Sequence, residues 1–524
     1  MSDRQLPWIV AALVGGIILS WLLVVPPGAQ PDEHSHLVRS GALVLRADKT
    51  DGFYVLPDRY VMTDPGCYAF DPFAPATCAA PLEHSGQDLL VLTRADDYPP
   101  GGHGLTGAAT LLPGLDPVWW ARLVAGVVAT VFVSAAIVLA LRRSRLLGGA
   151  LLLALTPMAW SSLPSANPST YAIAGATALW VALLTTDLRS RVPAATAWLI
   201  ASGWAALAVS RRDGLVWACL IVFGVAVFRR FALVDLARRL TVGPVALAGV
   251  ATLVTLVWGV TSDSRTSQLV VVAPILLVVA ELVRSKADAV PPEARWWLVA
   301  IGAIAGVVAW PLLVSTRSKG WDTDLVVAIV NQTDDNLVEA IGRLGWLDAP
   351  IPSFAVYAWL LAIGGAVGFA LITNVRGLVA AVVLVFVAAL SSWTFELLQN
   401  NDSGTYWQGR YSLPLLIGVP LLLVVRPGDR ADGADPDGIV GRFGARLMVW
   451  VTITGLLVLN LGAWAAARRW GVGLDGSYLP WRWDTSLQPV PSVLPLALLA
   501  ACSLGLGWSV IARPERAADD PAVA

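Results

Sequence analysis

Apolar runs of about 18 to 25 residues recur along the whole 524-residue chain, and each is long enough to cross a hydrocarbon layer of roughly 30 Å as a helix. Hydrophobic residues make up 56% of the chain and charged residues only 14%, whereas an ordinary soluble domain is about 25% charged. The sequence therefore predicts an all-α polytopic membrane protein and excludes a soluble globular fold.

We expect about 12–14 transmembrane helices in a single integral membrane domain over residues 1–524. The first run, Trp8 to Val25, resembles a signal peptide, but VVPPGAQPDEH after it offers a poor cleavage site, so we expect it to be retained. The expected spans are residues 7–25, 117–141, 147–164, 169–186, 193–209, 214–228, 241–260, 268–283, 296–314, 354–373, 377–394, 411–425, 447–467 and 491–511.

Arginine and lysine are concentrated in one set of loops, which the positive-inside rule assigns to the cytoplasm together with the tail 512–524. These basic loops are residues 142–145, 187–191, 229–239, 284–295, 374–377 and 426–446. The opposite set is then extracytoplasmic and comprises 26–116, the short turns near 165, 211 and 264, and the segments 315–353, 395–410 and 468–490. We expect a multi-pass protein of the plasma (inner) membrane whose active face is extracytoplasmic, because the motifs lie in this second set.

The segment PDEHSH, residues 31–36, places two carboxylates and two imidazoles directly after the first span. Residues 32 to about 45 are predicted to form a short helix on the membrane surface, within a first loop that carries such amphipathic helices. Pro31 suits the first helical position, and Asp32 and Glu33 would lie in the first turn, where acidic side chains complement the helix dipole.

On such a helix Asp32, His36 and Arg39 fall near one face. A carboxylate at a membrane–water boundary can act as a general base toward an acceptor hydroxyl, so Asp32 and Glu33 are the candidate catalytic residues. In the alternative interpretation, both acids only favour the helix N-terminus and pair with Arg39.

A divalent metal is the one cofactor that this segment suggests, with His34 and His36 as candidate ligands beside the two acids. At a spacing of i, i+2 the two imidazoles would point to different sides of a helix, which argues against a shared metal.

Later in the first loop, DDYPPGGHG carries Tyr98 and His103. Its two prolines are predicted to stop any helix and to fix an extended turn at the mouth of the second span. Arg122 lies one turn inside that span, where a guanidinium must find an anion or extend to the interface. Tyr98, His103 and Arg122 are therefore candidate substrate-binding residues, as are His36 and Arg39.

Cys67 and Cys78 bracket a proline-rich stretch of the first loop, and on the oxidising side of a membrane they are expected to form a disulfide. Cys219 and Cys502 fall inside spans and are expected to be packing residues.

Two arginine motifs suit a phosphate group. Arg211 and Arg212, in SRRDG, are expected on the outer side; alternatively the span count is off by one and this is a cytoplasmic turn. Arg410, in WQGRYSLP, would lie at headgroup level, where Tyr411 could position it against a lipid phosphate. In the alternative, Arg410 is an ordinary interfacial anchor.

Nucleic acid is not an expected partner, because the net charge is −1 and the basic residues are dispersed among loops. No glycine-rich phosphate-binding pattern follows a strand, so nothing indicates nucleotide binding.

PDEHSH after the first span, YPP before the second, TPM…NPS over 156–169, LGWLD and QGRYSLP together resemble a bacterial family of integral membrane proteins. The family is catalogued as domain of unknown function twenty-one forty-two and is grouped with the GT-C-type glycosyltransferases. The resemblance covers about residues 8–511. The last outer loop, from Arg468, also resembles the corresponding loop of actinobacterial relatives.

The resemblance implies a GT-C-like arrangement and an enzyme that moves a sugar from a polyprenyl-phosphate donor to a glycan, lipid or protein of the cell envelope. Asp32 and Glu33 match the place of the usual GT-C base, and Gly409, Arg410 and Tyr411 look like the family's late motif. Two other classes stay open: a transporter or flippase of lipid-linked glycans, and a non-catalytic partner in envelope assembly. Membrane lipids are expected partners in all three cases.

Overall fold

The computed structural model describes residues 3–62, 65–79, 84–187, 190–262, 267–286, 323–399, 406–426 and 439–512. The expected span 296–314 lies outside these residues, as does most of the basic loop 426–446 and almost all of the tail from residue 512.

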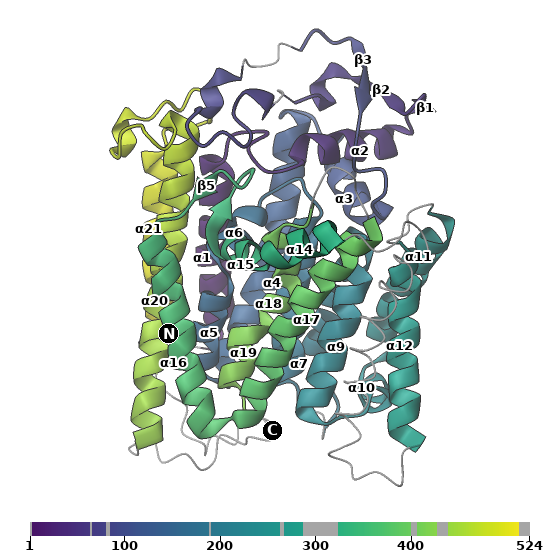
Figure 1. The fold of residues 1–524 in the computed structure, drawn as a ribbon, viewed down its shortest axis with the longest axis vertical. Helices are drawn as coiled ribbons and strands as arrows, with labels where there is room; N and C mark the ends of the chain where they lie inside the picture. Colours follow the sequence, from purple (N-terminus) through teal and green to yellow (C-terminus); the bar gives the residue numbers. More distant parts are fainter. Residues whose placement is uncertain are drawn as a thin grey trace. The chain divides into compact units, whose positions relative to one another are not determined.

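Long apolar helices dominate the described part of the chain and confirm the predicted all-α polytopic membrane fold (Figure 1). Seven of them are long and apolar enough to cross a membrane, and the bent pair α9 (Gly214–Arg229) and α10 (Leu233–Arg239), at 101°, brings the number to eight if it forms one span. The seven are α1 (Leu6–Val24), α4 (Pro117–Arg143), α11 (Val242–Thr261), α16 (Ser353–Thr373), α17 (Val375–Gln399), α20 (Ile439–Val472) and α21 (Val493–Ile511).

Other predicted spans are short or interrupted helices. The expected span 147–164 is divided into α5 (Arg145–Ala154) and α6 (Pro157–Ser162), because Pro157 has no N–H to continue the helix and instead starts a new one, which Thr156 caps. The expected span 411–425 is likewise interrupted, as a 3₁₀ turn η4 (Gly409–Ser412), α18 (Leu413–Leu416) and α19 (Gly418–Val424).

The chain divides into two compact units. Unit 1 comprises Met1–Ala174, Ile341–Gly364 and Arg446–Glu515, and unit 2 comprises Gly175–Ala340, Gly365–Ala445 and Arg516–Ala524. Among the described residues the boundaries fall within four helices, namely α7 (Ser169–Thr185), α15 (Thr333–Gly342), α16 and α20.

In unit 1, helix α1 packs against α4 and α21. Helices α1 and α21 can approach closely because Gly16 has no side chain; a Cβ at this position would collide with the Sγ atom of Cys502. Cys502 and, in unit 2, Cys219 are both buried free thiols inside helices.

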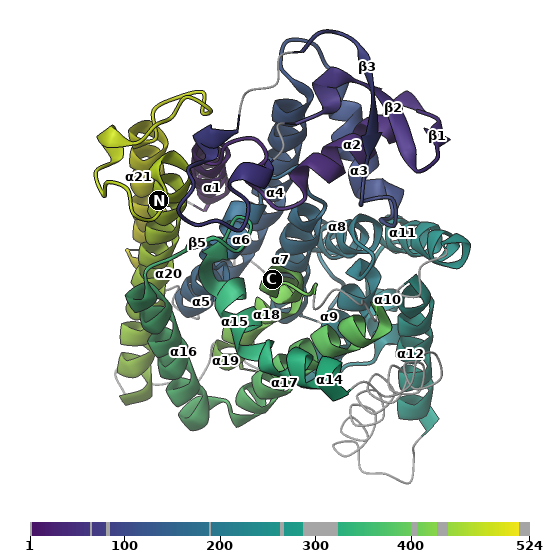
Figure 2. The ribbon, with the colours of Figure 1, turned by 45° about the horizontal axis from the view of Figure 1, so that its top comes forward.

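The first outer segment of unit 1 is more structured than the expected loop with surface helices, since it also contains a small antiparallel sheet in the order β1-β2-β3. The turn between β1 and β2 is Asp51–Gly52, whose φ values of 51° and 88° suit a tight hairpin. Tyr54 and Leu56 alternate inward from β2 and form a core with α2. Helix α2 also packs on α3 (Figure 2). The elements are α2 (Glu33–Leu45), β1 (Lys49–Thr50), β2 (Phe53–Pro57), β3 (Asp88–Leu92) and α3 (Pro100–Thr110).

Helix α3 corrects the interpretation of YPP as a helix stop. Pro100 occupies the first helical position, where its missing N–H would have no partner anyway, so the two prolines start this helix.

In unit 2, helix α8 (Ala194–Ser210) packs against α9 and α11, and α12 (Ser267–Lys286) packs against the same two helices. Helices α14 (Thr323–Asn331) and α15 (Thr333–Gly342) precede the hairpin β4 (Arg343–Leu344) and β5 (Ala349–Pro350), which belongs to unit 1.

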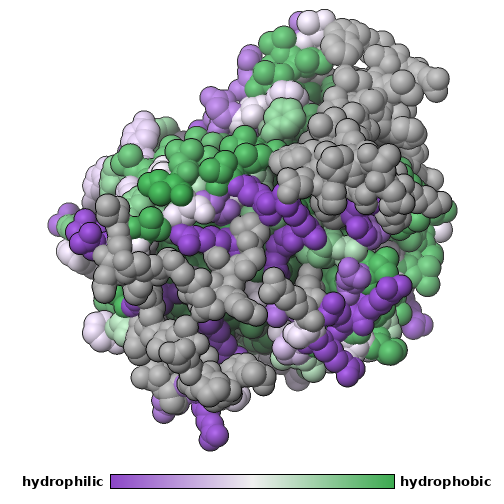
Figure 3. Space-filling model, turned by 90° about the horizontal axis from the view of Figure 1, so that it is seen from below, coloured by the Kyte–Doolittle hydropathy of each residue, from purple (hydrophilic) through white to green (hydrophobic). Residues whose placement is uncertain are grey.

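Basic residues close several helices at the loops that the sequence assigned to the cytoplasm. Arg142 and Arg143 lie in the last turn of α4, and Arg238 and Arg239 in that of α10. The face drawn in Figure 3 shows hydrophilic residues, in purple, among hydrophobic ones.

Candidate functional site

A buried ion pair joins the start of α2 to the span α4. The guanidinium of Arg122 donates from Nε to Oε1 of Glu33 at 2.8 Å and from Nη2 to Oε2 at 2.5 Å, and both side chains are 0% exposed. Arg122 also donates to the carbonyl oxygens of Val25 and Pro26 at 2.7 and 2.9 Å. Glu33 is therefore the anion that the position of Arg122 inside a span required.

Glu33 is held by backbone donors as well. Its Oε2 accepts the amide of Gly28 and its Oε1 the amide of Ala166, each at 3.2 Å. Both carboxylate oxygens thus accept two hydrogen bonds each, in a site closed to solvent. This carboxylate ties the chain after α1 to α4 and to the 156–169 motif.

Asp32 lies directly before this pair in a different environment. Its φ of 61° is left-handed, and its side chain is half-buried. Helix α2 therefore begins at Glu33, one residue after Asp32, and Pro31 is not the first helical residue as expected. Asp adopts this conformation more readily than most residues, but at a cost in free energy. The segment therefore leaves one acidic residue partly exposed and buries the next.

The segment before α2 is fixed by three side-chain hydrogen bonds, one donated by its own Gln30 and two accepted by its backbone. Gln30 donates to Ser161 O at 2.8 Å, and Asn167 donates to Pro31 O at 3.2 Å. The indole of Trp346 donates to Gly28 O at 3.1 Å. The motifs TPM…NPS and LGWLD therefore hold residues 28–31 in place.

The four histidine and tyrosine candidates of unit 1 divide into two groups. His36 Nδ1 lies 3.1 Å from His103 Nε2, and the His36 ring meets Tyr98 at 5.0 Å in a T-shaped contact. Burial lowers the pKa of His103 to about 3, so its imidazole is neutral at physiological pH. The ring of His34 lies instead 5.9 Å from that of Trp346.

The proposed metal ligands His34 and His36 thus contact different rings. Among the residues that the structure describes, no group of three or more His, Cys, Asp or Glu side chains is arranged to hold a metal ion.

Arg39 pairs with Asp96 and not with the acids at the start of α2. Its Nη1 lies 3.5 Å from Asp96 Oδ1 and donates to Tyr54 OH at 3.1 Å. Lys49 donates to Asp96 at 2.6 Å, and this hydrogen bond raises the pKa of Lys49. Arg39 therefore joins α2 to the small sheet.

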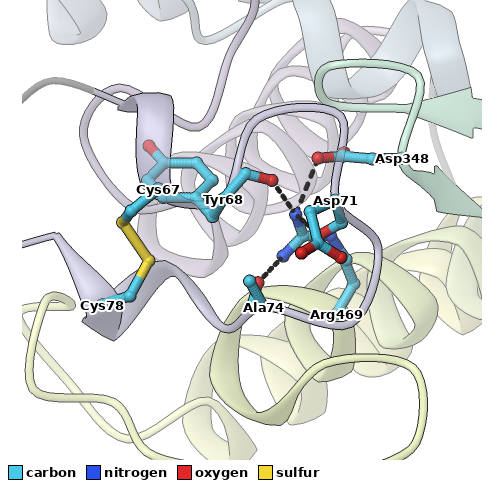
Figure 4. The surroundings of a disulfide bond; sticks show 7 residues. All are labelled: Cys67, Tyr68, Asp71, Ala74, Cys78, Asp348 and Arg469. Carbon is cyan, nitrogen blue, oxygen red and sulfur yellow. Dashed lines mark hydrogen bonds and ion pairs between the residues drawn. A yellow bond between two sulfur atoms is a disulfide. The ribbon is translucent and has the colours of Figure 1, made fainter.

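Cys67 and Cys78 are joined by a disulfide with a Cα–Cα distance of 6.2 Å (Figure 4). The loop between them surrounds the side chain of Arg469, which is fully buried at the end of α20. The guanidinium donates to the carbonyl oxygens of Tyr68 at 2.7 Å, Asp71 at 2.9 Å and Ala74 at 2.7 Å.

Asp348, from LGWLD, completes this cluster by accepting from Arg469 Nη2 at 2.7 Å (Figure 4). Burial raises the pKa of Asp348, whereas the charge and the hydrogen bond of Arg469 oppose the rise. The sequence did not indicate Arg469 or Asn167 as functional candidates, although both lie in or beside stretches that carried the family resemblance.

Unit 2 holds the remaining candidates. Arg211 binds Asp213 bidentately, at 2.8 and 3.0 Å, and its guanidinium lies 4.3 Å from the ring centroid of Tyr411. The guanidinium of Arg410 lies 5.0 Å from the same centroid and donates to Tyr411 OH at 3.1 Å. Arg212 is half-buried. Two cations thus contact one phenol ring.

Buried carboxylates fix the backbone that leads into Arg410. Glu396 accepts the amides of Tyr406 and Trp407, and Glu339 accepts the amide of Gly409 at 2.8 Å. A Cβ at Gly409 would collide with the backbone of α15, so only glycine fits there. The sequence pattern gave no sign of the role of Glu339.

The model of the family described as "Predicted membrane protein (DUF2142)" matches residues 16–419. A solved structure that is similar to the chain is the crystal structure of ArnT from Cupriavidus metallidurans bound to undecaprenyl phosphate, with 13% identity and a TM-score of 0.38 over 98% of this chain and 77% of that chain. No curated protein sequence matches the chain. Because the family match covers most of the sequence, the chain belongs to the DUF2142 family of membrane proteins.

Proposed function

We propose that this protein is a GT-C-like membrane glycosyltransferase that moves a sugar from a polyprenyl-phosphate donor to a cell-envelope acceptor on the extracytoplasmic face of the plasma membrane. The observation that carries the proposal is the contrast between two adjacent acids. Asp32 is half-buried in a left-handed conformation, and Glu33 is fully buried in its pair with Arg122. Costly backbone conformations that the surroundings hold in place are typical of functional sites.

Asp32 is the catalytic base in this proposal, and Glu33 is a positioning residue. A base must reach the acceptor hydroxyl within hydrogen-bond distance, which the enclosed carboxylate of Glu33 cannot do. The pair with Arg122 instead fixes the position of α2 and therefore of Asp32.

In the proposed step, the Asp32 carboxylate takes the proton of an acceptor hydroxyl. The hydroxyl oxygen attacks the anomeric carbon, and the bond from that carbon to the phosphate oxygen breaks on the opposite side. The electron pair leaves with polyprenyl phosphate, and the anomeric configuration is inverted. Because phosphate is already a good leaving group, stabilisation of its charge matters more than its protonation.

Arg410, which is only 3% exposed, is the first candidate to hold the donor phosphate inside the protein, with Tyr411 as its positioning partner. Arg211 is a weaker candidate, because Asp213 already neutralises it. Arg212 is half-buried beside this pair and is the second choice. Guanidinium groups suit this task because they present several donors to phosphate oxygens.

Two observations support an extracytoplasmic position for the first outer segment. The Cys67–Cys78 disulfide suits an oxidising compartment. Helix α4 leaves this segment at Pro117 and ends at Arg142 and Arg143, as expected for a span with its cytoplasmic end at the arginines.

The test uses the purified full-length chain with a panel of radiolabelled polyprenyl-phosphate monosaccharides and envelope lipid extracts as acceptors. We expect release of free polyprenyl phosphate together with a product of inverted anomeric configuration, and loss of both in Asp32→Asn. Movement of labelled donor across a vesicle membrane without any transfer would contradict the proposal and favour a flippase.

A further inference from the structure

The disulfide loop of unit 1 contains an aromatic residue, Phe70, whose ring is only partly covered by the protein. Phe70 has a left-handed φ of 65°, and its side chain is 66% exposed. For a bulky residue this conformation is an outlier that costs free energy. Exposure of most of the ring adds a hydrophobic cost, whereas the backbone amide of Phe70 is used by the fold, since it donates a hydrogen bond to Asp348.

The loop is nevertheless held firmly on both sides of Phe70. Arg469 donates to the carbonyl oxygen of Tyr68, two residues before Phe70, at 2.7 Å and to that of Asp71, directly after Phe70, at 2.9 Å (Figure 4). The amide of Leu474 donates to Pro72 O at 3.0 Å. With the disulfide, these bonds fix the exposed ring in position, as expected for a preorganised binding surface.

Ring contacts connect Phe70 to the segment of the proposed base. Phe70 meets Trp346 at 5.5 Å, and Trp346 in turn meets His34 at 5.9 Å. His34 is two residues from Asp32. Trp346 itself lies between two left-handed residues, Gly345 at 60° and Leu347 at 64°.

We propose that Phe70 is a stacking platform for a pyranose ring of the acceptor glycan, an inference that rests on the proposed function. The C–H face of a pyranose carries partial positive charge and packs on the negative face of an aromatic ring. Its hydroxyl groups require polar partners, and exposed Asp71 and half-buried His34 are at hand. A carboxylate next to Phe70 makes the hydrocarbon of a lipid an unsuitable occupant.

Three variants separate a binding role of Phe70 from a structural one. Phe70→Gly removes the ring and also relieves the left-handed backbone, so we expect an unchanged or higher melting temperature with lost sugar binding. Phe70→Tyr keeps the ring and should keep binding. Phe73→Ala is the matched control, because Phe73 lies in the same loop and is 59% exposed.

The measurement is saturation-transfer NMR on the full-length chain in nanodiscs, with a millimolar mixture of methyl gluco-, galacto- and mannopyranosides as the probe. For the wild type, Phe70→Tyr and Phe73→Ala we expect transfer to the ring C–H protons of at least one glycoside, and for Phe70→Gly at least a fivefold loss. Equal transfer in Phe70→Gly and wild type, no transfer in wild type, or a lower melting temperature of Phe70→Gly would overturn the platform.

The platform and the transferase fail in distinguishable ways. Binding that depends on Phe70 in a chain that transfers no sugar would leave the platform standing and remove the transferase. Sugar transfer that depends on Asp32, combined with sugar binding that does not depend on Phe70, would support the transferase and remove the platform.

Discussion

Replacing Glu33 by glutamine should destabilise the protein severely, because the change removes one charge from a buried pair. Each oxygen of Glu33 accepts two hydrogen bonds, from Arg122 and from the amides of Gly28 and Ala166. In glutamine one oxygen becomes an NH₂ group that faces two donors, and the guanidinium of Arg122 stays buried without a counter-charge. Breaking such a pair costs about 3–5 kcal/mol, which corresponds to roughly a 10²- to 10⁴-fold change in the unfolding equilibrium.

The free energy of unfolding is measured by titrating the purified chain with SDS in mixed micelles and following its helicity by circular dichroism. Lys49→Gln is the matched control, because it breaks an ion pair whose lysine side chain is 44% exposed and should cost less than about 1 kcal/mol. Arg122→Met combined with Glu33→Met should cost less than the sum of the two single changes. If Glu33→Gln is as stable as wild type, the assignment of Glu33 as a positioning residue is refuted.

Two further predictions concern the first outer segment. Because burial lowers the pKa of His103 from 6.5 to about 3, the unfolded chain binds a proton below pH 6.5 that the folded chain does not. Stability should therefore fall by up to about 1.4 kcal/mol per pH unit from 6.5 downward, and His103→Gln should flatten that slope in unfolding titrations at pH 5 to 7; identical slopes would contradict this. Replacing both Cys67 and Cys78 by serine should cost roughly 2–3 kcal/mol of stability. In intact cells treated with reductant, an impermeant maleimide should label wild type and spare this double variant, whereas labelling only after permeabilisation would place the loop on the wrong side.

Hydropathy predicted the fold class because span length and apolar composition are local properties of the sequence. Sequence reasoning failed at residues that local rules allow in two roles, such as a proline, which can either end or start a helix. Pro100 and Pro157 were taken as a helix stop and as a residue inside a span, but both start helices because an N1 proline loses no hydrogen bond. The strand 53–57 was missed because its alternation is short and lies in a segment of mixed character.

The sequence predicted which kinds of side chain form the candidate site, but it did not predict which of them pair with one another. The position of Arg122 inside a span required an anion, but nothing local identified Glu33, which is 89 residues away. Arg469 and Asp348 are 121 residues apart and meet only through the folding of unit 1. Such long-range contacts depend on which helices pack together, and a single sequence does not encode that in any local pattern.

The most direct test of the proposed function compares sugar transfer by Asp32→Asn and Asp51→Asn. Both residues have a left-handed φ, 61° and 51°, and asparagine tolerates that conformation well, so neither change should disturb the fold. A general base typically contributes about 10²- to 10⁴-fold in rate. The account predicts a loss of that size in Asp32→Asn and wild-type transfer in Asp51→Asn; wild-type transfer in both would contradict it.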